Sequence, residues 1–316
     1  MNPTTNQVHI DVGLSDASIK YRNGAFVAED FLRPKLVDKI SNKIWIYGKE
    51  NFDLVNDLRA PGTRGAESDW TLSTTPYLCE EHSQTGKIPD QARTNADAPL
   101  SLEVDMTEIK TEQIQLRLEY DSAAMLTTPG NYDSSLYEDL SAGGNVQWSD
   151  PNSDPIGDVE AAKALVLEAC GREPNVMLLG HKVKIALKNH PKIVERVKYG
   201  GMGFAGKVTD AMLAELFDLD EILDAKAVYN SSAVEGAGPD SYIWGNNAIL
   251  AVRPQAIGLK TLALGAIIRV RGYRLTETWY QQPESSTFVR VRDFYQPFMI
   301  SNLAGYLFTN AVQAGA

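Results

Sequence analysis

The residues that could do chemistry begin with a glycine-rich stretch, "YGGMGFAGKVTD", at residues 199–210. Its glycines fit the dinucleotide-binding spacing G-x-G-x-x-G at Gly201, Gly203 and Gly206. Residues 201–207 also match most of the phosphate-binding motif G-x-x-x-x-G-K-[ST], in which the final hydroxyl binds magnesium. Val208 stands in that last position, so the magnesium-binding hydroxyl is missing.

The elements expected around this stretch argue against a phosphate site. A phosphate-binding loop follows a buried strand, whereas the apolar residues before this loop follow Pro191 at helical spacing. Thr209 suits the cap of a following helix. A dinucleotide site also needs an acidic residue about 20 positions later at a strand end, but Asp224 follows a predicted helix. The pattern therefore predicts a flexible loop between two helices, without a cofactor, at Gly200, Gly201, Gly203 and Gly206.

His181 and His190 are the next candidates, because imidazole serves in both metal binding and proton transfer. They stand nine positions apart, at opposite ends of one predicted helix, so the two rings cannot share a metal ion directly. No H-E-x-x-H, H-x-E or G-x-S-x-G motif accompanies them. We therefore predict structural roles for both, and we assign no catalytic and no metal-binding residue.

The composition is that of a globular protein with an acidic balance. The chain has 316 residues, 43% hydrophobic and 22% charged, which suffices for one large domain or two ordinary ones. The 41 acidic residues outnumber the 30 basic ones and give a formal charge of −11, which argues against a dedicated nucleic-acid binder. Cys79 and Cys170 lack the spacing of a metal or redox pair. No apolar run approaches the roughly 20 residues that span a membrane.

The first half of the chain contains a polar excursion followed by a long helical segment. Residues 53–98 are rich in Gly, Pro, Thr, Ser and Asp, and they predict an excursion containing a two-stranded ribbon. An excursion of this length is unusual inside a compact monomer, which favours support from outside the chain. Residues 100–127 lack Gly and Pro and predict a spine helix with an apolar stripe at Ile109, Leu116, Tyr120 and Ala124.

The second half predicts a compact block of helices and strands. Asp154 and Pro155 suit a helix start, and Gly171 suits its end. The stretch "NVMLLG" predicts a short apolar strand. Further helices are expected on both sides of Pro191 and after Thr209, and strands at residues 226–230, 241–245 and 248–254. The chain from residue 261 onward is mostly strand, with turns at Gly272 and Pro283.

Two long stretches resemble one known family. "DQARTNADAPLSLEVDMTEI" is similar to the segment that leads into the spine helix in a group of phage major capsid proteins. "WSDPNSDPIGDVEAAKALVLEACGREPNVMLLGHKVKIALKNHPKIVERVKYG" resembles the start of the axial (A) domain in the same group, and "RAPGT" fits the base of its ribbon. The order of arm, ribbon, spine helix, α/β block and closing strands resembles the Hong Kong 97-type capsid fold of tailed-phage capsid proteins and encapsulins. The resemblance covers nearly the whole chain from Phe26.

The resemblance implies an α+β fold with named parts. These are an N-terminal arm (1–28), a peripheral (P) domain in three pieces (29–52, 99–149 and 255–300), an E-loop ribbon (53–98), an A domain (150–254), and a C-terminal segment returning to the A domain (301–316). The E-loop would lie across a neighbouring subunit, which would cover its apolar residues Trp70, Leu72, Tyr77 and Leu78. The mobile glycines of the A domain would let one sequence fit both fivefold and sixfold surroundings.

The resemblance also implies a function, a structural coat protein rather than an enzyme. Copies of the chain would close as pentamers and hexamers into an icosahedral head around double-stranded phage DNA, without binding that DNA specifically. The chain would be made in the host cytoplasm and located in the virion, without a membrane partner. Its partners would be itself, a separate scaffolding protein, a portal and a decoration protein. Two alternatives stay open: an encapsulin-like shell protein, and a soluble α/β nucleotide-binding enzyme using His181 or the loop from Gly201 to Lys207.

Overall fold

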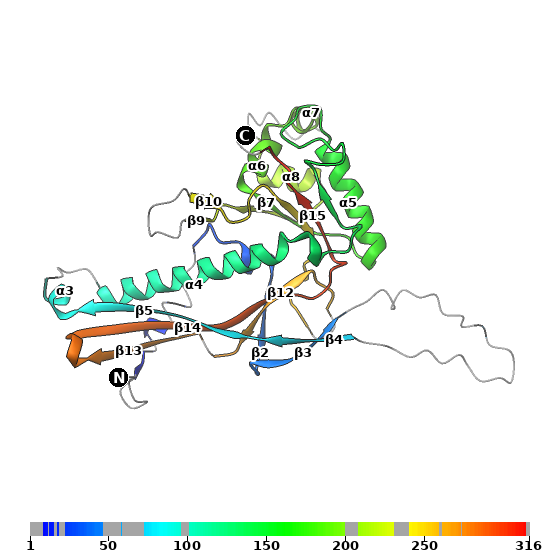
Figure 1. Ribbon diagram of the computed structural model, residues 1–316. Coiled ribbons are helices and arrows are strands. Elements are labelled where there is room, and N and C mark those ends of the chain that lie inside the picture. Colours follow the sequence, from blue (N-terminus) through cyan, green and yellow to red (C-terminus); the bar gives the residue numbers. More distant parts are fainter. Residues whose placement is uncertain are drawn as a thin grey trace.

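A computed structural model shows a long lower body that carries an upper lobe (Figure 1). It describes residues 9–11, 13–15, 18, 23–46, 58, 73–95, 101–199, 208–230, 240–258, 261–272 and 274–313. Within these residues the strands form one sheet in the body, one in the lobe, and two separate two-stranded ribbons.

The sheet of the lower body is organised around one long strand, β14. The strand order is β1–β13–β14–β12–β2, and β5 also pairs with β14. Burial alternates along much of β14, as expected of a strand with one face on a core. Among the described strand pairs of this sheet, β2 and β12 alone run parallel. The strands are β1 (His9–Ile10), β2 (Pro34–Val37), β5 (Glu80–Pro89), β12 (Gly265–Val270), β13 (Leu275–Gln281) and β14 (Ser286–Met299).

The spine helix is α4 (Leu102–Leu126), which lies along β14 and β5. The predicted apolar stripe is wrong, because Ile109 and Tyr120 are 51% and 39% exposed. The buried face carries hydroxyl residues among its apolar ones: Thr107, Thr111, Ile114, Leu118, Ser122 and Leu126. Thr107 and Thr111 donate to the carbonyls of Glu103 and Thr107, respectively. Because the two threonine hydroxyls bond to carbonyls of their own helix, these threonines can face the core. A search for apolar residues alone therefore selects the wrong face of α4.

The upper lobe is a sheet with four helices packed on one face. Its strand order is β6–β15–β11–β7–β8. The strands are β6 (Tyr137–Asp139), β7 (Val176–Gly180), β8 (Glu221–Ala225), β11 (Ala248–Ala251) and β15 (Gly305–Thr309). The helices are α5 (Pro155–Cys170), α6 (His181–Asn189), α7 (Pro191–Tyr199) and α8 (Asp210–Leu216).

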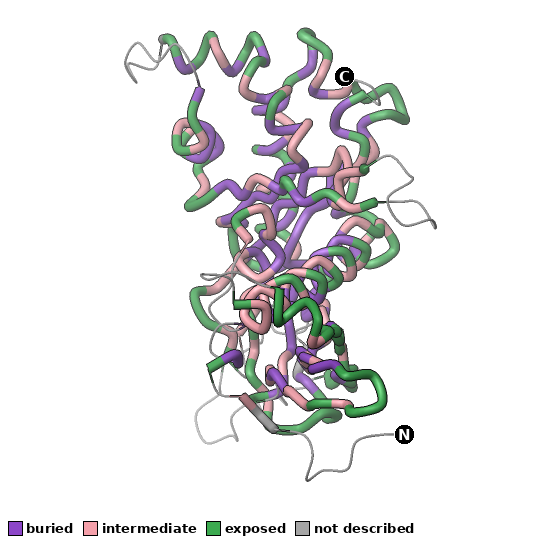
Figure 2. The backbone as a smooth tube through the Cα atoms, turned by 90° about the vertical axis from the view of Figure 1, so that its left-hand side faces the viewer, coloured by how far each residue is buried: buried purple, intermediate pink, exposed green. Residues whose placement is uncertain are grey.

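Two hydrophobic cores meet at this second sheet, one on each face. Met177 and Leu179 of β7 pack with the helices, and Val176 and Leu178 pack toward α4 and the lower sheet. Every residue of β7 is buried, which explains why its sequence is an uninterrupted apolar run. Figure 2 shows the buried residues concentrated through the lobe and its junction with the body. Gly180 ends β7 where only glycine fits, because a Cβ there would lie 2.2 Å from the Gly245 carbonyl oxygen.

Several short elements connect these layers. The predicted helix end at Gly171 is confirmed by its left-handed backbone, with φ of 69°, and the predicted turn at Gly272 by a φ of 75°. Asp154 precedes α5, but its side chain accepts no capping hydrogen bond there. The remaining elements are α2 (Ala28–Phe31), β3 (Ser41–Ile46), β4 (Ser73–Leu78), α3 (Asp90–Asn95), η2 (Pro129–Asn131), β9 (Val228–Asn230), β10 (Asp240–Tyr242) and η3 (Gln282–Glu284).

The ribbon differs from the predicted segment 53–98 at both ends. Its paired strands are β3 and β4, so it begins before residue 53. After Leu78 the chain joins the lower sheet, where all of β5 pairs with β14. The predicted connector also differs, since β6 pairs with β15 of the lobe and Trp148 is fully buried in the lobe core. These boundaries depend on pairing between strands that are distant in sequence. A local pattern of polar residues carries no information about that pairing.

Candidate functional site

The predicted contact residues of the ribbon have different environments. Trp70 and Leu72 lie outside the described residues. Leu78 is 53% exposed and stays a predicted contact. Tyr77 differs from the prediction, since its own chain leaves it only 5% exposed and packs it with Ile44 and Cys79. Its hydroxyl donates to the Lys39 carbonyl oxygen at 3.2 Å, so this ring is a core residue of the subunit.

The glycine-rich loop, with Gly200, Gly201, Gly203 and Gly206, also lies outside the described residues, but the elements flanking it are defined. Helix α7 ends at Tyr199 before the loop, and α8 begins at Asp210 after it. Thr209 caps α8 as predicted, because its hydroxyl accepts a hydrogen bond from the Met212 amide. A helix therefore occupies the position at which a phosphate-binding loop requires a strand.

His181 belongs to a cluster of charged residues between α6, α8 and β8. Its Nδ1 lies 3.0 Å from Asp224, which follows helix α8 as predicted and lies within strand β8. Lys184 contacts Asp210 at 2.7 Å and Asp224 at 2.6 Å. Lys188 contacts Asp210 at 2.6 Å. These charged groups neutralise one another and hold α6, α8 and β8 together. Their role is therefore to stabilise the fold.

The electrostatics of this cluster are dominated by pairing. Burial alone lowers the pKa of Lys184, but hydrogen bonds to Asp210 and Asp224 outweigh it and raise the pKa above its usual value. Burial alone raises the pKa of Asp224, but Lys184 and His181 lower it below the ordinary range. No group of three His, Cys, Asp or Glu residues within the described part of the chain could hold a metal ion.

His190 lies at the other end of α6 and joins different groups. Its Nε2 is 3.0 Å from the Ser153 hydroxyl and 3.1 Å from the Asp150 carbonyl oxygen. The ring is 3% exposed and holds the segment before α5 against the end of α6. The two histidines therefore do not converge on one site.

A buried carboxylate at the junction of body and lobe was not found from the sequence. Glu119 of α4 is 1% exposed and accepts hydrogen bonds from the amides of Val27 and Ala28, at 3.0 and 2.8 Å. It also accepts one from the indole nitrogen of Trp244 at 2.6 Å. Burial raises the pKa of Glu119, and the three hydrogen bonds oppose that rise. No spacing distinguishes this glutamate from the surface glutamates of the same helix.

A group of three charged residues ties α2 to the lower sheet. Arg269 of β12 lies 2.7 Å from Glu29 of α2 and 3.1 Å from Asp293 of β14. Asp293 is 2% exposed. Together with Glu119, these three residues fix the short helix α2 between the spine helix and the sheet, so the junction has one defined geometry.

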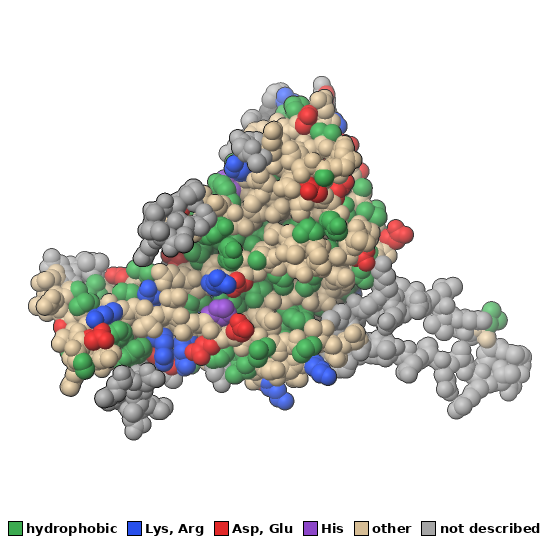
Figure 3. Space-filling model, in the orientation of Figure 1, with side chains coloured by type: hydrophobic (Ala, Val, Ile, Leu, Met, Phe, Trp, Pro, Cys, Tyr) green, Lys and Arg blue, Asp and Glu red, His purple; other side chains and the backbone are tan. Residues whose placement is uncertain are grey.

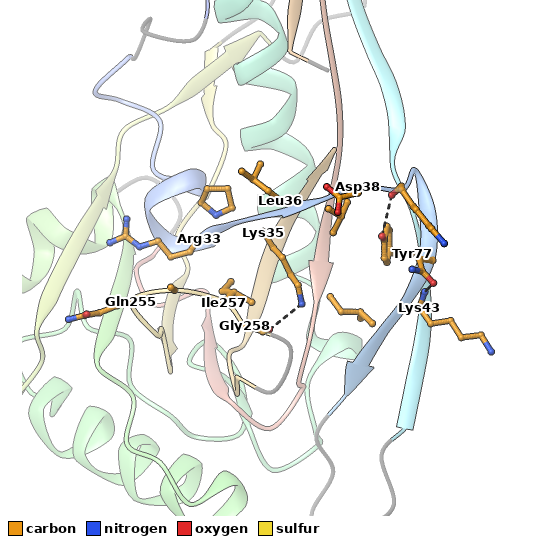
Figure 4. A pocket seen from close by; sticks show the side chains of 15 residues that line it. Arg33, Lys35, Leu36, Asp38, Lys43, Tyr77, Gln255, Ile257 and Gly258 are labelled. Atoms are coloured by element: carbon orange, nitrogen blue, oxygen red, sulfur yellow. Dashed lines mark hydrogen bonds between the residues drawn. The ribbon is translucent and has the colours of Figure 1, made fainter. Parts of the chain in front are cut away.

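The base of the ribbon encloses a groove of about 800 Å³, shown in Figure 4. Strand β2, the start of β3, Tyr77 and residues 255–258 line it. Its apolar floor includes Leu36, which is 55% exposed. Four cations line it against one carboxylate, Asp38: Arg33, Lys35, Lys39 and Lys43.

Exposed apolar side chains also occur on helices of both parts. They include Ile109 and Tyr120 on α4, and Leu165, Leu167 and Ile185 on the lobe helices. On the face shown in Figure 3, such hydrophobic side chains lie among charged ones. No described helix is both long enough and apolar enough to cross a membrane. The arrangement offers surfaces for protein contact, and within the residues that the structure describes it brings no nucleophile, base and oxyanion donors together.

Comparison with known proteins shows which proteins this chain resembles. No family model matches the chain. It is 29% identical over 306 residues to the major capsid protein of Burkholderia phage BcepMu, covering 94% of this chain and 95% of that protein. It is 27% identical over 318 residues to the major capsid protein of Pseudomonas phage JBD67, covering 96% and 98%.

A solved structure agrees with these relatives. The crystal structure of a phage-related protein from Bordetella bronchiseptica matches with a TM-score of 0.77 and 27% identity, over 96% of this chain and 99% of that one. Both curated relatives are phage capsid proteins matched end to end, which favours a phage coat protein over the encapsulin-like and enzyme alternatives. The chain belongs to the major capsid protein family of tailed phages, with the Hong Kong 97-type α+β fold, and is a structural protein of the virion head shell.

Proposed function

We propose that the chain assembles as pentamers and hexamers into an icosahedral head around double-stranded phage DNA. The observation that carries this proposal is the two-stranded ribbon of β3 and β4 at the edge of the body (Figure 1). A two-stranded ribbon is at best marginally stable alone in water. Leu78 stays exposed on it although Tyr77 is buried, so one face is left for a neighbouring subunit to cover.

The upper lobe supports packing around the symmetry axes. Leu165 and Leu167 of α5 are 39% and 40% exposed, and Ile185 of α6 is 47% exposed. These side chains lie on the lobe helices, which form the outer layer over its sheet. Identical lobes in a ring would cover such residues through head-to-tail contacts, which close when the rotation between subunits is correct.

The acidic balance supports a container that holds DNA without specific binding. A formal charge of −11 opposes strong attachment to phosphates. A separate scaffolding protein, a portal and a decoration protein are the further partners that we propose, on the resemblance to the family.

Sedimentation and electron microscopy of the purified protein test this proposal. We expect particles of megadalton size with icosahedral symmetry, together with pentamers or hexamers under conditions that disfavour closure. A protein that stays a monomer or dimer under all conditions, at concentrations and ionic strengths that favour association, would contradict it.

A further inference from the structure

The groove at the base of the ribbon has a charge opposite to that of the whole protein. The chain carries a formal charge of −11, yet four cations line this groove with one carboxylate. That carboxylate, Asp38, lies 3.7 Å from Arg271, so its charge is shared with a cation outside the groove lining. Lys39 and Lys43 are exposed, and neither ammonium group forms an ion pair with a carboxylate among the described residues. The groove therefore keeps an excess of positive charge.

Lys35 contributes a positive charge that the groove orients without balancing it. Its ammonium group donates to the Gly258 carbonyl oxygen at 3.2 Å, and Figure 4 shows the side chain pointing toward this residue. A carbonyl oxygen fixes the position of the ammonium group but carries no full negative charge. Burial accordingly lowers the pKa of Lys35. A bound carboxylate would therefore stabilise a charge that is already held in place.

The shape of the groove fits an extended ligand. Every residue of β2 lines it, and this strand alone spans about 13 Å at the usual rise of a strand. Figure 4 shows Arg33 and Lys43 at opposite ends of the lining, with Lys35 between them. Cations that are spread along a groove in this way match carboxylates repeated along a chain better than they match a single compact anion.

An apolar side chain and an open strand edge favour a polypeptide over a nucleic acid. Leu36 is 55% exposed at the groove, and Ile257 also lines it. Strand β2 is last in the order of its sheet, so its second edge has no strand partner among the described residues. Proline and lysine commonly protect such edges, and Pro34 and Lys35 stand on this one beside the exposed leucine. A peptide that adds to a sheet edge gains main-chain hydrogen bonds, and side-chain contacts give it specificity.

Two acidic clusters of the described chain have the wrong shape for this groove. Residues 103–112 belong to the helix α4. Residues 150–154 form a turn, in which the Asp150 carboxylate accepts hydrogen bonds from the main-chain and side-chain nitrogens of Asn152. Neither cluster is extended, so neither can pair with a strand edge. This favours a segment of a separate protein as the occupant of the groove.

We propose that the groove binds an extended acidic segment of a separate protein, which adds as a strand to the open edge of β2. An apolar side chain of that segment packs against Leu36 and Ile257. Its carboxylates pair with the ammonium groups of Lys35, Lys39 and Lys43. The complex needs one subunit only, so it goes beyond the proposed assembly and does not depend on it.

Fluorescence anisotropy with the purified full-length protein tests this complex. The probe is a labelled peptide with four acidic residues around one leucine, and a second peptide carries lysines in place of the acidic residues. We expect the acidic peptide to bind about tenfold more tightly than the basic one, or better, with an affinity that falls as the salt concentration rises. N-methylation of the main-chain amides of the acidic peptide should abolish binding, because it removes the donors that pair with a strand edge.

Charge reversal in the groove identifies the cations that bind the peptide. Lys39→Glu with Lys43→Glu should weaken binding of the acidic peptide about tenfold or more. The matched control is Arg196→Glu with Lys198→Glu, which makes the same change of charge on α7 of the upper lobe and should stay within about twofold of wild type. Circular dichroism and melting should match wild type for both variants, since all four side chains are exposed. Lys39→Gln with Lys43→Gln removes the charges without reversing them and should give an intermediate loss.

A double-mutant cycle locates the leucine of the peptide. Leu36→Ser should weaken binding of the leucine peptide about fivefold, and serine in place of the peptide leucine should weaken it by a similar factor. The two changes together should cost little more than either one alone, because both remove the same contact. Additive losses would place the peptide leucine away from Leu36 and contradict the proposed orientation.

The remaining outcomes separate this complex from other occupants. No binding of the acidic peptide to wild type, or unchanged binding to the variant with both groove lysines reversed, would overturn the proposal. A labelled DNA duplex that binds wild type more tightly than the peptide, and loses binding in that variant, would make the groove a nucleic-acid site instead. Loss of particles in that variant, without peptide binding by wild type, would assign the groove to a second copy of this chain. Peptide binding by a protein that forms no particles would support the proposal and contradict the proposed function.

Discussion

The indole nitrogen of Trp244 donates a 2.6 Å hydrogen bond to the carboxylate of Glu119, and this contact joins the segment before β11 to the middle of the spine helix. The same carboxylate accepts the first amides of α2. Three parts of the chain that are distant in sequence therefore share one buried acceptor. Because Trp244, Val27 and Ala28 belong to the core between the lobe sheet and the body, the contact fixes the lobe on the body with little freedom.

Replacing Glu119 by alanine should destabilise the free subunit by about 2–4 kcal/mol, because three buried donors would lose their acceptor. Glu119→Gln should cost less, since its amide keeps one acceptor oxygen. Urea unfolding of the free subunit measures both. Glu160→Ala, on the exposed side of α5, is the matched control and should change stability by no more than about 0.5 kcal/mol. Equal effects of Glu119→Ala and Glu160→Ala would contradict a buried junction.

The sequence predicted those elements that depend on neighbouring residues. It did not predict features that depend on contacts between distant segments of the chain. The apolar run of β7, the helix end at Gly171 and the cap at Thr209 each depend on a few neighbouring residues, and all three were predicted. The buried face of α4 was not, because threonine hydroxyls satisfied within the helix replace apolar residues on it. The buried state of Tyr77 depends on Cys79 and on strands almost two hundred residues later, which no local pattern contains.

The charged cluster and the basic groove also depend on contacts between distant segments. The charged cluster around Lys184 could not be foreseen, because Asp224 reaches α6 only through the parallel pairing of β7 with β8. The basic groove likewise requires β2 and residues 255–258 to lie together. The resemblance of long sequence stretches identified the family. Reasoning about individual candidate residues had only argued against catalytic and cofactor-binding sites.

Lys184→Met should destabilise the subunit by about 2–4 kcal/mol at neutral pH, because it leaves the buried Asp224 with weaker partners. The folded-state pKa of Asp224 lies below its ordinary value of 3.8, since its pairing with Lys184 and His181 outweighs burial. A depressed carboxyl pKa contributes stability that is present above the unfolded value and is lost as the pH falls through the folded value.

The difference between wild type and Lys184→Met should therefore be constant near neutrality and shrink below about pH 3.8. Unfolding free energies measured at several pH values for both proteins check this. A difference that grew on acidification would contradict the assignment of Asp224 as an ionised partner of Lys184.

Free subunits should bind double-stranded DNA only weakly, with a Kd above about 10 μM at physiological salt, because the net charge opposes contact with phosphates. The binding that does occur should fall steeply between low and physiological salt. Fluorescence anisotropy of a labelled duplex across a salt series measures both properties. Submicromolar binding at physiological salt would contradict a container that holds its genome loosely.

Neighbouring residues Tyr77 and Leu78 should respond in opposite ways to alanine substitution. Tyr77→Ala removes a ring that is 5% exposed and packed within its own chain, so it should cost the free subunit about 3–5 kcal/mol. Leu78→Ala removes a side chain that is 53% exposed, so the free subunit should keep its stability while particle yield or heat resistance falls. Trp70→Ala should behave like Leu78→Ala, as expected of a side chain covered by a neighbour. Melting of the free subunit and sedimentation of particles measure the two effects separately. Unfolding of the Leu78 variant would place that residue in the subunit core, and particles as heat-resistant as wild type from both the Leu78 and Trp70 variants would remove the ribbon from the interface.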